Sequence, residues 1–578
     1  MYIAINHKNT PPAYDWQCNN CFVKGLDEKN VTYRESEDTL YGIIGWIYDK
    51  SEDVATAYRR YQKGGYQLLS EIDGDFIYFE IHRDGCCCVV SDREGDIPVY
   101  YREDKEQGII ISTECSELFY DFSLTTLRES AVNDFLRFGT LVGDETMHKD
   151  VHLLQGGSEL RFSTDKGLSK KRHYRFHYEE SVISRGEIEE KVYNSYVKGV
   201  AKRLEGKETE TCIFLSGGMD SRLLLAVANN ITGNKVGAVT FGQKYSDEVD
   251  VARLCANVRG NDFQWIQTAP SDFVVNAEEY IRKVCCGDMF PQSYIIKAAQ
   301  QINKQAFATG FALDAYMGGT FLNQEALKAT STLSEFLKDH FSLLKMNVLT
   351  KAELQELSRD NLARFLDVDN ETVLREAKEW DGYSVKDAIQ AFGIDNRAKR
   401  SVALRETTPG RYLQRINPSS DRDFLNAVSK IPSSYRINHQ FYHSMFMRYA
   451  SEYATIPYNN TTLPVSAPVE LWKQGSANEL NRENLYAQFM QQHNAVHEEK
   501  LYYPHYYSDF DGYSRYDKKW KQLFERYLLN PDAVIVNLWF DRHKLARLYQ
   551  DHLKGKCNNR KKLIFLTSIE IFLRSKLN

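Results

Sequence analysis

The segment that most constrains the fold spans residues 213–225 and reads IFLSGGMDSRLLL. An apolar strand leads directly into Ser-Gly-Gly (216–218), and an apolar helix follows. Consecutive glycines let backbone N–H groups turn toward an anion at the start of a helix, and the hydroxyls of Ser216 and Ser221 add donors. Asp220 would repel a polyphosphate unless a bridging Mg²⁺ lay between them. The segment predicts a magnesium-dependent nucleotide site; the plainer alternative is a turn in which Asp220 only interacts with the helix dipole.

Strands and helices alternate on both sides of this segment. The apolar strands alternate with amphipathic helices, which is typical of a parallel, doubly wound α/β sheet. The expected strands are 211–215, 236–241, 263–266 and 306–309, and the expected helices are 187–204, 221–229, 248–257 and 293–304. We therefore assign residues 187–470 to a nucleotide-binding α/β domain.

The two flanking regions have other patterns. Residues 1–180 contain short strands separated by turn residues, with helical stretches at 51–70 and 131–142, which is typical of antiparallel hairpins in an α+β domain. From about residue 325 onward almost every segment has helical periodicity, and residues 471–578 are expected to form a helical C-terminal extension.

The composition argues against several classes of function. A net charge of −6 argues against a nucleic-acid-binding protein, which normally has a basic excess. No apolar run is long enough to span a membrane, and the first residues lack the pattern of a signal peptide, so we expect a cytoplasmic protein without a membrane partner. The 11 cysteines, spread through a long chain, are expected to be reduced thiols.

Several motifs resemble the asparagine synthetase family of ATP pyrophosphatases. The loop at 216–221 matches SGGxDS, and residues 309–319, TGFALDAYMGG, resemble the family's second signature, SGxGxDxxxGG. Residues 74–114 are similar to the end of the family's glutaminase-like N-terminal domain. Residues 396–438 and 456–458 resemble its C-terminal pattern. The resemblance implies a degenerate Ntn-hydrolase-like αββα domain, followed by a PP-loop domain of the HUP-like type and a helical C-terminal region.

The resemblance also implies a chemistry and a set of site residues. Family members bind ATP and Mg²⁺, adenylate a substrate carboxylate and pass the acyl group to a nitrogen nucleophile. Asp220 and Asp314 would hold Mg²⁺ and act in catalysis, because both follow neighbouring parallel strands and would converge at one crevice. The residues expected to cradle pyrophosphate or border the adenosine are Leu215, Ser216, Gly217, Gly218, Asp220, Ser221, Val239, Thr309 and Gly310.

Three departures from the family pattern affect the expected reaction. Glutamine-dependent members place a nucleophilic Cys at position 2, whereas this chain has Tyr2, so we expect no glutaminase activity. In this respect the chain resembles the family's β-lactam synthetases and lasso-peptide cyclases. Phe311 replaces a Glu or Tyr that assists proton removal, and Asn460 stands near the position of a Lys that would stabilise negative charge on the acyl intermediate.

The favoured hypothesis is an ATP- and Mg²⁺-dependent ligase that joins a small-molecule or peptide carboxylate to ammonia or a substrate amine. Its setting would be specialised biosynthesis: a modified peptide, a surface glycan or a secondary metabolite. Two alternatives stay open, namely an ATP-binding regulatory homologue without amide-forming activity and an asparagine synthetase that uses free ammonia. The sequence leaves the substrates open, and it leaves open whether the protein is a homodimer.

Overall fold

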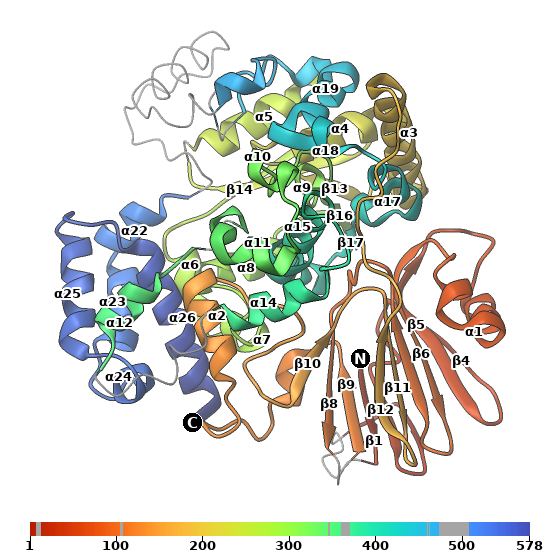
Figure 1. Cartoon of the computed structure of the whole chain (residues 1–578), viewed down its shortest axis with the longest axis horizontal. Coiled ribbons are helices and arrows are strands. Elements are labelled where there is room, and N and C mark those ends of the chain that lie inside the picture. Colours follow the sequence, from red (N-terminus) through yellow and green to blue (C-terminus); the bar gives the residue numbers. More distant parts are fainter. Residues whose placement is uncertain are drawn as a thin grey trace.

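The computed structural model describes residues 1–6, 13–104, 108–244, 246–344, 347–359, 370–458, 461, 463–472 and 508–577. Figure 1 shows a strand-rich N-terminal domain at the lower right, a helix-covered parallel sheet above it, and a group of C-terminal helices at the left. The fold class predicted from the sequence is confirmed.

The N-terminal domain contains two antiparallel sheets of six strands each. The first sheet has the order β10 (Val151–Leu154), β8 (Val99–Asp104), β9 (Gly108–Ser112), β1 (Tyr2–Ile5), β3 (Cys21–Lys24) and β2 (Trp16–Cys18). The second has the order β12 (Gly167–Arg172), β11 (Ser158–Ser163), β7 (Cys87–Ser91), β6 (Gly74–His82), β5 (Thr39–Ile47) and β4 (Val31–Glu35).

Side-chain alternation along these strands builds a four-layer αββα arrangement. In β6, Ile77 and Phe79 join the apolar cluster that also contains residues of the first sheet, whereas Tyr78 points to the other side and packs with α1 (Val54–Leu69). On the far side of the first sheet lies α2 (Glu129–Phe138), whose apolar residues cluster with β1, β8 and β9. Both layers of helix are therefore needed to bury the outer faces of the sheets.

The second domain is built on a five-stranded sheet in which every neighbouring pair is parallel. Its order is β15 (Phe263–Gln267), β14 (Gly237–Gly242), β13 (Thr211–Phe214), β16 (Ala306–Ala308) and β17 (Gln414–Ile416). The chain adds strands first on one side of β13 and then on the other. The winding direction therefore reverses between β13 and β16, and open sheets of this kind bind ligands at such a point.

Helices cover both faces of this sheet. Ile213 belongs to a cluster with α3 (Arg185–Leu204) and α4 (Met219–Thr232), whereas its neighbour Cys212 belongs to a cluster with α8 (Tyr294–Gln300). Adjacent residues of one strand are thus buried on opposite faces, which explains why the strands are apolar throughout rather than alternating.

The largely helical region predicted after residue 325 is confirmed, but the sequence pattern did not identify one short strand within it, β17. This strand has only three residues, Gln414–Ile416, and it lies at the edge of the parallel sheet. Three residues are too few for a periodic pattern, so only pairing with β16 identifies the segment as a strand.

The C-terminal helices pack against the N-terminal domain as well as against the parallel-sheet domain. They are α22 (Phe510–Tyr516), α23 (Lys518–Leu528), α24 (Val534–Leu538), α25 (Arg542–Leu553) and α26 (Arg560–Leu577). The ring of Phe565 in α26 lies 5.0 Å from that of Phe135 in α2, and Ser568 accepts a hydrogen bond of 3.0 Å from the backbone N–H of Phe290. In Figure 1, α26 accordingly lies beside α2.

A buried arginine ties the two domains together. Arg203 of α3 is fully buried, and its guanidinium lies 3.2 Å from Asp75 and 3.5 Å from Asp73, both in the N-terminal domain. It also lies 3.1 Å from Asp421, which follows β17. One cation therefore neutralises carboxylates from separate parts of the chain.

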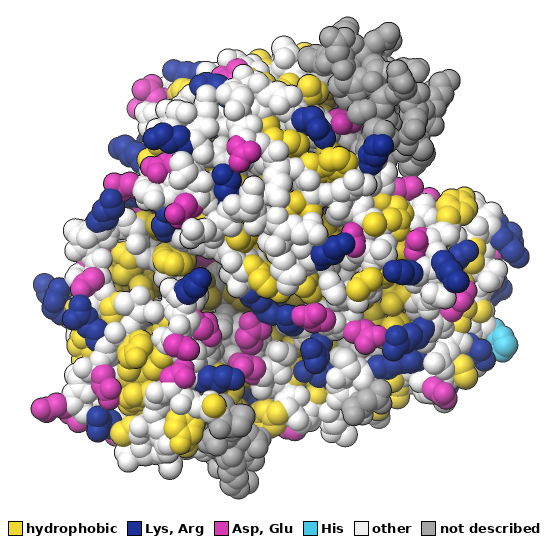
Figure 2. Space-filling model, turned by 180° about the vertical axis from the view of Figure 1, so that it is seen from behind, with side chains coloured by type: hydrophobic (Ala, Val, Ile, Leu, Met, Phe, Trp, Pro, Cys, Tyr) yellow, Lys and Arg dark blue, Asp and Glu magenta, His cyan; other side chains and the backbone are white. Residues whose placement is uncertain are grey.

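No described helix is long and apolar enough to cross a membrane. On the face of the molecule shown in Figure 2, basic and acidic side chains are interspersed, with small hydrophobic groups between them.

Candidate active site

The turn at residues 216–221 is held by its own side chains. Ser216 and Ser221 lie with their Oγ atoms 3.1 Å apart, and Gly218 donates its backbone N–H to the Ser216 oxygen over 3.1 Å. Gly218 is the N-cap of α4, so the turn sits at the start of that helix. The hydroxyls and the helix N-terminus thus face the same crevice, which is an arrangement suited to an anion.

A second loop meets this turn where the winding of the sheet reverses. Thr309 and Gly310 follow β16, and a Cβ atom added at Gly310 would lie only 2.7 Å from the backbone carbonyl carbon of Asp220. Only glycine permits this approach, because the clash would be with backbone rather than with a flexible side chain. The two signature loops are therefore packed directly against each other.

Two carboxylates lie together in the crevice. The backbone N–H of Asp314 donates to Asp220 Oδ2 over 3.2 Å, and the hydroxyl of Tyr442 donates to Asp220 Oδ1 over 2.8 Å. Burial, together with the charge of Asp314, raises the pKa of Asp220 well above its usual range. Thr320 donates its hydroxyl to Asp314 Oδ2 over 3.1 Å. The pair is thus oriented by neutral donors, and its charge is not matched by an adjacent lysine or arginine contact among the described residues.

Two adjoining cavities contain most of the predicted site residues. The first, which we call the carboxylate cavity, has a volume of about 450 Å³ and is lined by Ser216, Asp220, Ser221, Thr309, Gly310 and Asp314. The second, the strand-edge cavity, has a volume of about 240 Å³ and is lined by Leu215, Ser216 and Val239. Ser216, Phe214 and Glu406 lie in both walls, so the cavities form one elongated crevice. Gly217 lies within the turn, where its carbonyl accepts from Arg222 over 2.8 Å.

The donor set fits a magnesium ion that is shared with a phosphate. Asp220 and Asp314 provide carboxylate oxygens on one side of the carboxylate cavity, and Mg²⁺ in nucleotide sites takes one or two carboxylates while phosphates and water complete its shell. Within the described part of the chain no group of three or more His, Cys, Asp or Glu side chains could hold a metal. The residues therefore fit a metal bound together with a ligand better than a metal bound by protein alone.

The sequence interpretation missed a cation in this crevice. Arg397 lines the carboxylate cavity, and burial together with nearby Arg405 lowers its pKa, although the charge of Asp314 acts in the opposite direction. It belongs to a π-helical segment, Ile394–Ala403. The available signal was the basic run from 397 to 405, which the resemblance covers but which we did not assign to the site.

Phe311 and Ala312 complete the second loop. Phe311 is 6% exposed, and the guanidinium of Arg415 lies 5.9 Å from the centre of its ring. Ala312, at the position where the family signature has its second glycine, has φ = 57°, in the left-handed region that disfavours residues with a Cβ. Ala312 therefore holds a conformation that glycine, the family residue at this position, adopts without strain.

Asn460 lies outside the described residues. The chain leading to it is held against the turn, because the buried Arg222 donates to the carbonyls of Ile456, over 3.0 Å, and of Pro457. The same guanidinium binds Gly217.

Tyr2 is the first residue of β1, which is an interior strand of the first sheet. It pairs with Lys24 of β3 and Ser112 of β9, and its side chain is 7% exposed. Burial, with a contribution from Glu117, raises the pKa of its phenol above the usual value. The Met1 ammonium donates to Thr113 over 2.9 Å.

Comparison with protein families agrees with this geometry. A family model described as asparagine synthase matches residues 192–574, and one described as a glutamine amidotransferase domain matches residues 45–174. No individual curated protein matches the chain significantly. The asparagine synthase match covers both signature loops, the π-helical segment and the C-terminal helices. The chain therefore belongs to the asparagine synthase family and is a carbon–nitrogen ligase of the asparagine synthetase type.

Proposed function

We propose that this ligase uses ATP and Mg²⁺ to adenylate a substrate carboxylate and transfers the acyl group to ammonia or a substrate amine, without hydrolysing glutamine. The observation that carries the proposal is the Asp220–Asp314 pair beside Ser216 and Ser221, at the point where the sheet reverses its winding. The setting that we favour is specialised biosynthesis of a peptide, glycan or secondary metabolite.

The crevice suggests how the substrates are arranged. Leu215, Val239, Thr309 and Gly310 would border the adenosine, and the hydroxyls of Ser216 and Ser221 with the start of α4 would bind the pyrophosphate portion. Asp220 and Asp314 would hold Mg²⁺, which when bound neutralises phosphate charge. Arg397 is placed to bind a phosphate or stabilise charge on the acyl intermediate, a role for which Asn460 lacks a charge.

The reaction then requires two displacements. A carboxylate oxygen of the substrate attacks the α-phosphorus, the bond from that phosphorus to the bridging oxygen breaks, and pyrophosphate leaves. The nitrogen of the amine attacks the acyl carbon, and AMP leaves with the electron pair of the broken C–O bond. The nitrogen loses one proton in this second step. Phe311 accepts no proton, so we propose that another group or solvent does so.

The N-terminal domain supports a nitrogen source other than glutamine. Tyr2 is buried in the centre of a sheet, and burial raises the pKa of its phenol further from neutrality. A neutral phenol in this position is a poor nucleophile. We therefore propose that the domain is structural.

The buried phenyl ring of Phe311 favours one further candidate, an ATP-binding homologue that forms no amide. ATP–pyrophosphate exchange separates it from a ligase, because exchange requires the acid and ATP but no amine. We expect one acid in a panel of amino acids and dicarboxylates to induce exchange, and Asp314→Asn to abolish it. Tight Mg-ATP binding without exchange for any acid in the panel would favour the non-ligase. Exchange with aspartate, followed by asparagine formation from ammonium chloride, would identify an ammonia-dependent asparagine synthetase.

A further inference from the structure

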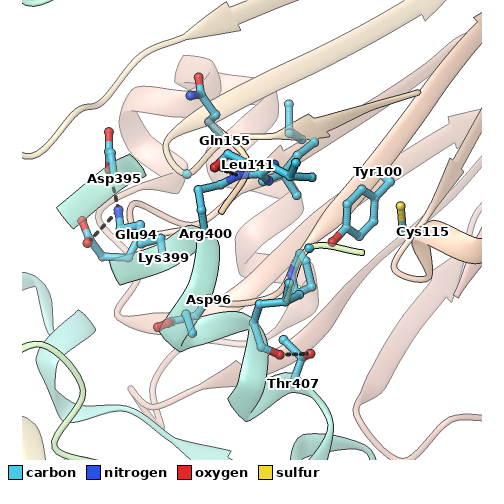
Figure 3. Close-up of a pocket in the computed structure, with 18 of the residues that line it drawn as sticks. Glu94, Asp96, Tyr100, Cys115, Leu141, Gln155, Asp395, Lys399, Arg400 and Thr407 are labelled. Carbon is cyan, nitrogen blue, oxygen red and sulfur yellow. Dashed lines mark hydrogen bonds and ion pairs between the residues drawn. The ribbon is translucent and has the colours of Figure 1, made fainter. Parts of the chain in front are cut away.

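A second pocket lies between the two domains, outside the nucleotide crevice (Figure 3). Its N-terminal-domain wall includes Tyr100, Leu141 and Leu153, and its opposite wall includes Val284 and Leu404. This part of the lining is apolar and would suit the body of a small organic molecule.

Charged side chains form another part of the wall, with three carboxylates and three cations. Each lining carboxylate already has a cationic partner: Glu94 lies 3.0 Å from Lys399, Asp395 lies 2.7 Å from Arg172, and Asp96 lies 2.9 Å from Arg415. The remaining lining cation is Arg400. Arg400 is therefore the one lining cation that makes no contact with a carboxylate among the described residues.

Arg400 makes its protein hydrogen bonds to backbone only. Its Nε donates to the Leu141 carbonyl over 3.3 Å and its Nη2 donates to the Glu145 carbonyl over 2.5 Å. A guanidinium has five N–H groups, so three have no protein acceptor among the described residues. Arg400 is half-buried in the pocket wall, and burial lowers the pKa of its guanidinium. A guanidinium with free donors in a pocket wall is a site for a carboxylate, which it can bind in bidentate fashion.

The pocket opens toward solvent on one side and approaches the reaction centre on the other. A large cleft between the domains shares Tyr100, Cys115 and Leu404 with its wall, so a molecule can enter from that side. Phe311 lies in the wall of both the pocket and the carboxylate cavity. The side chain of Phe311 therefore borders both the pocket and the cavity in which we place the nucleotide.

We propose that this interdomain pocket binds a small organic acid, with its carboxylate on Arg400 and its apolar body against Leu141, Leu153 and Leu404. The position of Phe311 makes the occupant one of the ligase's own substrates, held by a carboxylate that does not react. This last step rests on the proposed function, whereas the binding site itself does not.

The test uses ligand-observed NMR on the full chain with butyrate, butyramide and butylammonium, in the absence of ATP. We expect butyrate to bind with a dissociation constant on the order of 1 mM, and the amide and the amine to bind at least about tenfold more weakly. Arg400→Met should weaken butyrate binding by a similar factor. Ala403→Phe, which keeps Arg400 but fills the pocket from its wall, should also abolish binding.

Arg397→Met is the matched control, because Arg397 lies on the same π-helical segment but lines the carboxylate cavity. Butyrate binding should survive this change and should also survive saturating Mg-ATP. Equal binding of butyrate and butyramide, or binding that is lost in Arg397→Met but kept in Arg400→Met, would overturn the proposal. These experiments measure binding and not turnover. Such a result would therefore not contradict the proposed adenylation reaction, which is tested separately by pyrophosphate exchange.

Discussion

Charged side chains are paired at the domain interface but not in the nucleotide crevice. At the interface, Arg203 lies among three carboxylates, and Arg415 contacts both Asp96 and Glu406. In the crevice, Asp220 lies beside Asp314, and no lysine or arginine contacts Asp220 among the described residues. Ion pairs between the domains hold two parts of the chain in a fixed relative position. Carboxylates without a cationic partner instead favour the binding of a cationic ligand such as a metal ion. The comparison predicts that mutations at the interface alter stability and that mutations in the crevice alter binding.

The largest effect is expected for Arg203→Met. This change leaves Asp73, Asp75 and Asp421 buried without their shared cation, which should cost about 3–5 kcal/mol. The measurement is the thermal midpoint, with limited proteolysis to detect separation of the domains. Lys202→Met is the control: Lys202 contacts Asp73 and Asp421 from a more exposed position and should contribute no more than about 1 kcal/mol. Equal losses for the two variants would contradict a special role for the buried arginine.

The next largest effect is expected for Asp220→Asn, and it should separate binding from stability. Calorimetry should show Mg-ATP affinity reduced at least about tenfold, or about 1.4 kcal/mol, because a metal-binding carboxylate is lost. The ligand-free protein should melt no earlier than wild type, since the substitution removes repulsion from Asp314. A variant that melts at a lower temperature but binds Mg-ATP normally would show that Asp220 stabilises the fold and does not bind the ligand.

The third prediction concerns pH. Because the pKa of Asp220 is raised in the folded protein, the ligand-free folded state holds this proton more tightly than the unfolded state. Tighter binding of this proton stabilises the folded state fully at pH values below the pKa of Asp220 in the unfolded chain, which is near 4. The stabilisation is lost as the pH rises through the pKa of Asp220 in the folded protein. Mg-ATP requires the ionised form, so affinity should rise with pH by up to about tenfold per unit.

Calorimetry in two buffers of different ionisation enthalpy checks this point, since binding should release protons. Asp220→Asn should lose that release. If the variant released as many protons as the wild type, the released proton would come from another titratable group.

The smallest effect is expected for Ala312→Gly. Ala312 has φ = 57°, and a residue without a Cβ adopts this conformation without strain, so the change should stabilise the protein by up to about 1 kcal/mol. Ala315→Gly, within helix α9 (Leu313–Met317), should instead destabilise it by about 0.5–1 kcal/mol. The two thermal midpoints should therefore move in opposite directions.

The sequence predicted the parts of the site that depend on short, local patterns. The turn at 216–221 and the loop at 309–319 each carry their conformational requirement in their own residues, such as Gly310 at the close approach to Asp220. The alternation of apolar strands and helices was enough to predict the parallel sheet, and the family resemblance added the expectation that Asp220 and Asp314 lie close together.

Features that depend on contacts between distant segments were not predictable in this way. Arg397 and Arg400 stand three positions apart in one basic run, yet one lines the nucleotide crevice and the other the interdomain pocket. The π-helical geometry and the packing of the N-terminal domain decide this difference, and neither leaves a periodic signal. Strand β17 was missed for a related reason, since only its pairing with β16 defines it.

The packing of α26 on α2 has a consequence for how the chain is made. The apolar cluster around α2 contains residues from β1 to α26, so part of the apolar surface on this face of the N-terminal domain is buried only when α26 docks. During synthesis this face emerges from the ribosome early and α26 emerges late. The nascent N-terminal domain must therefore remain with an uncovered apolar surface while the parallel-sheet domain is translated, and that surface is a natural binding site for a chaperone.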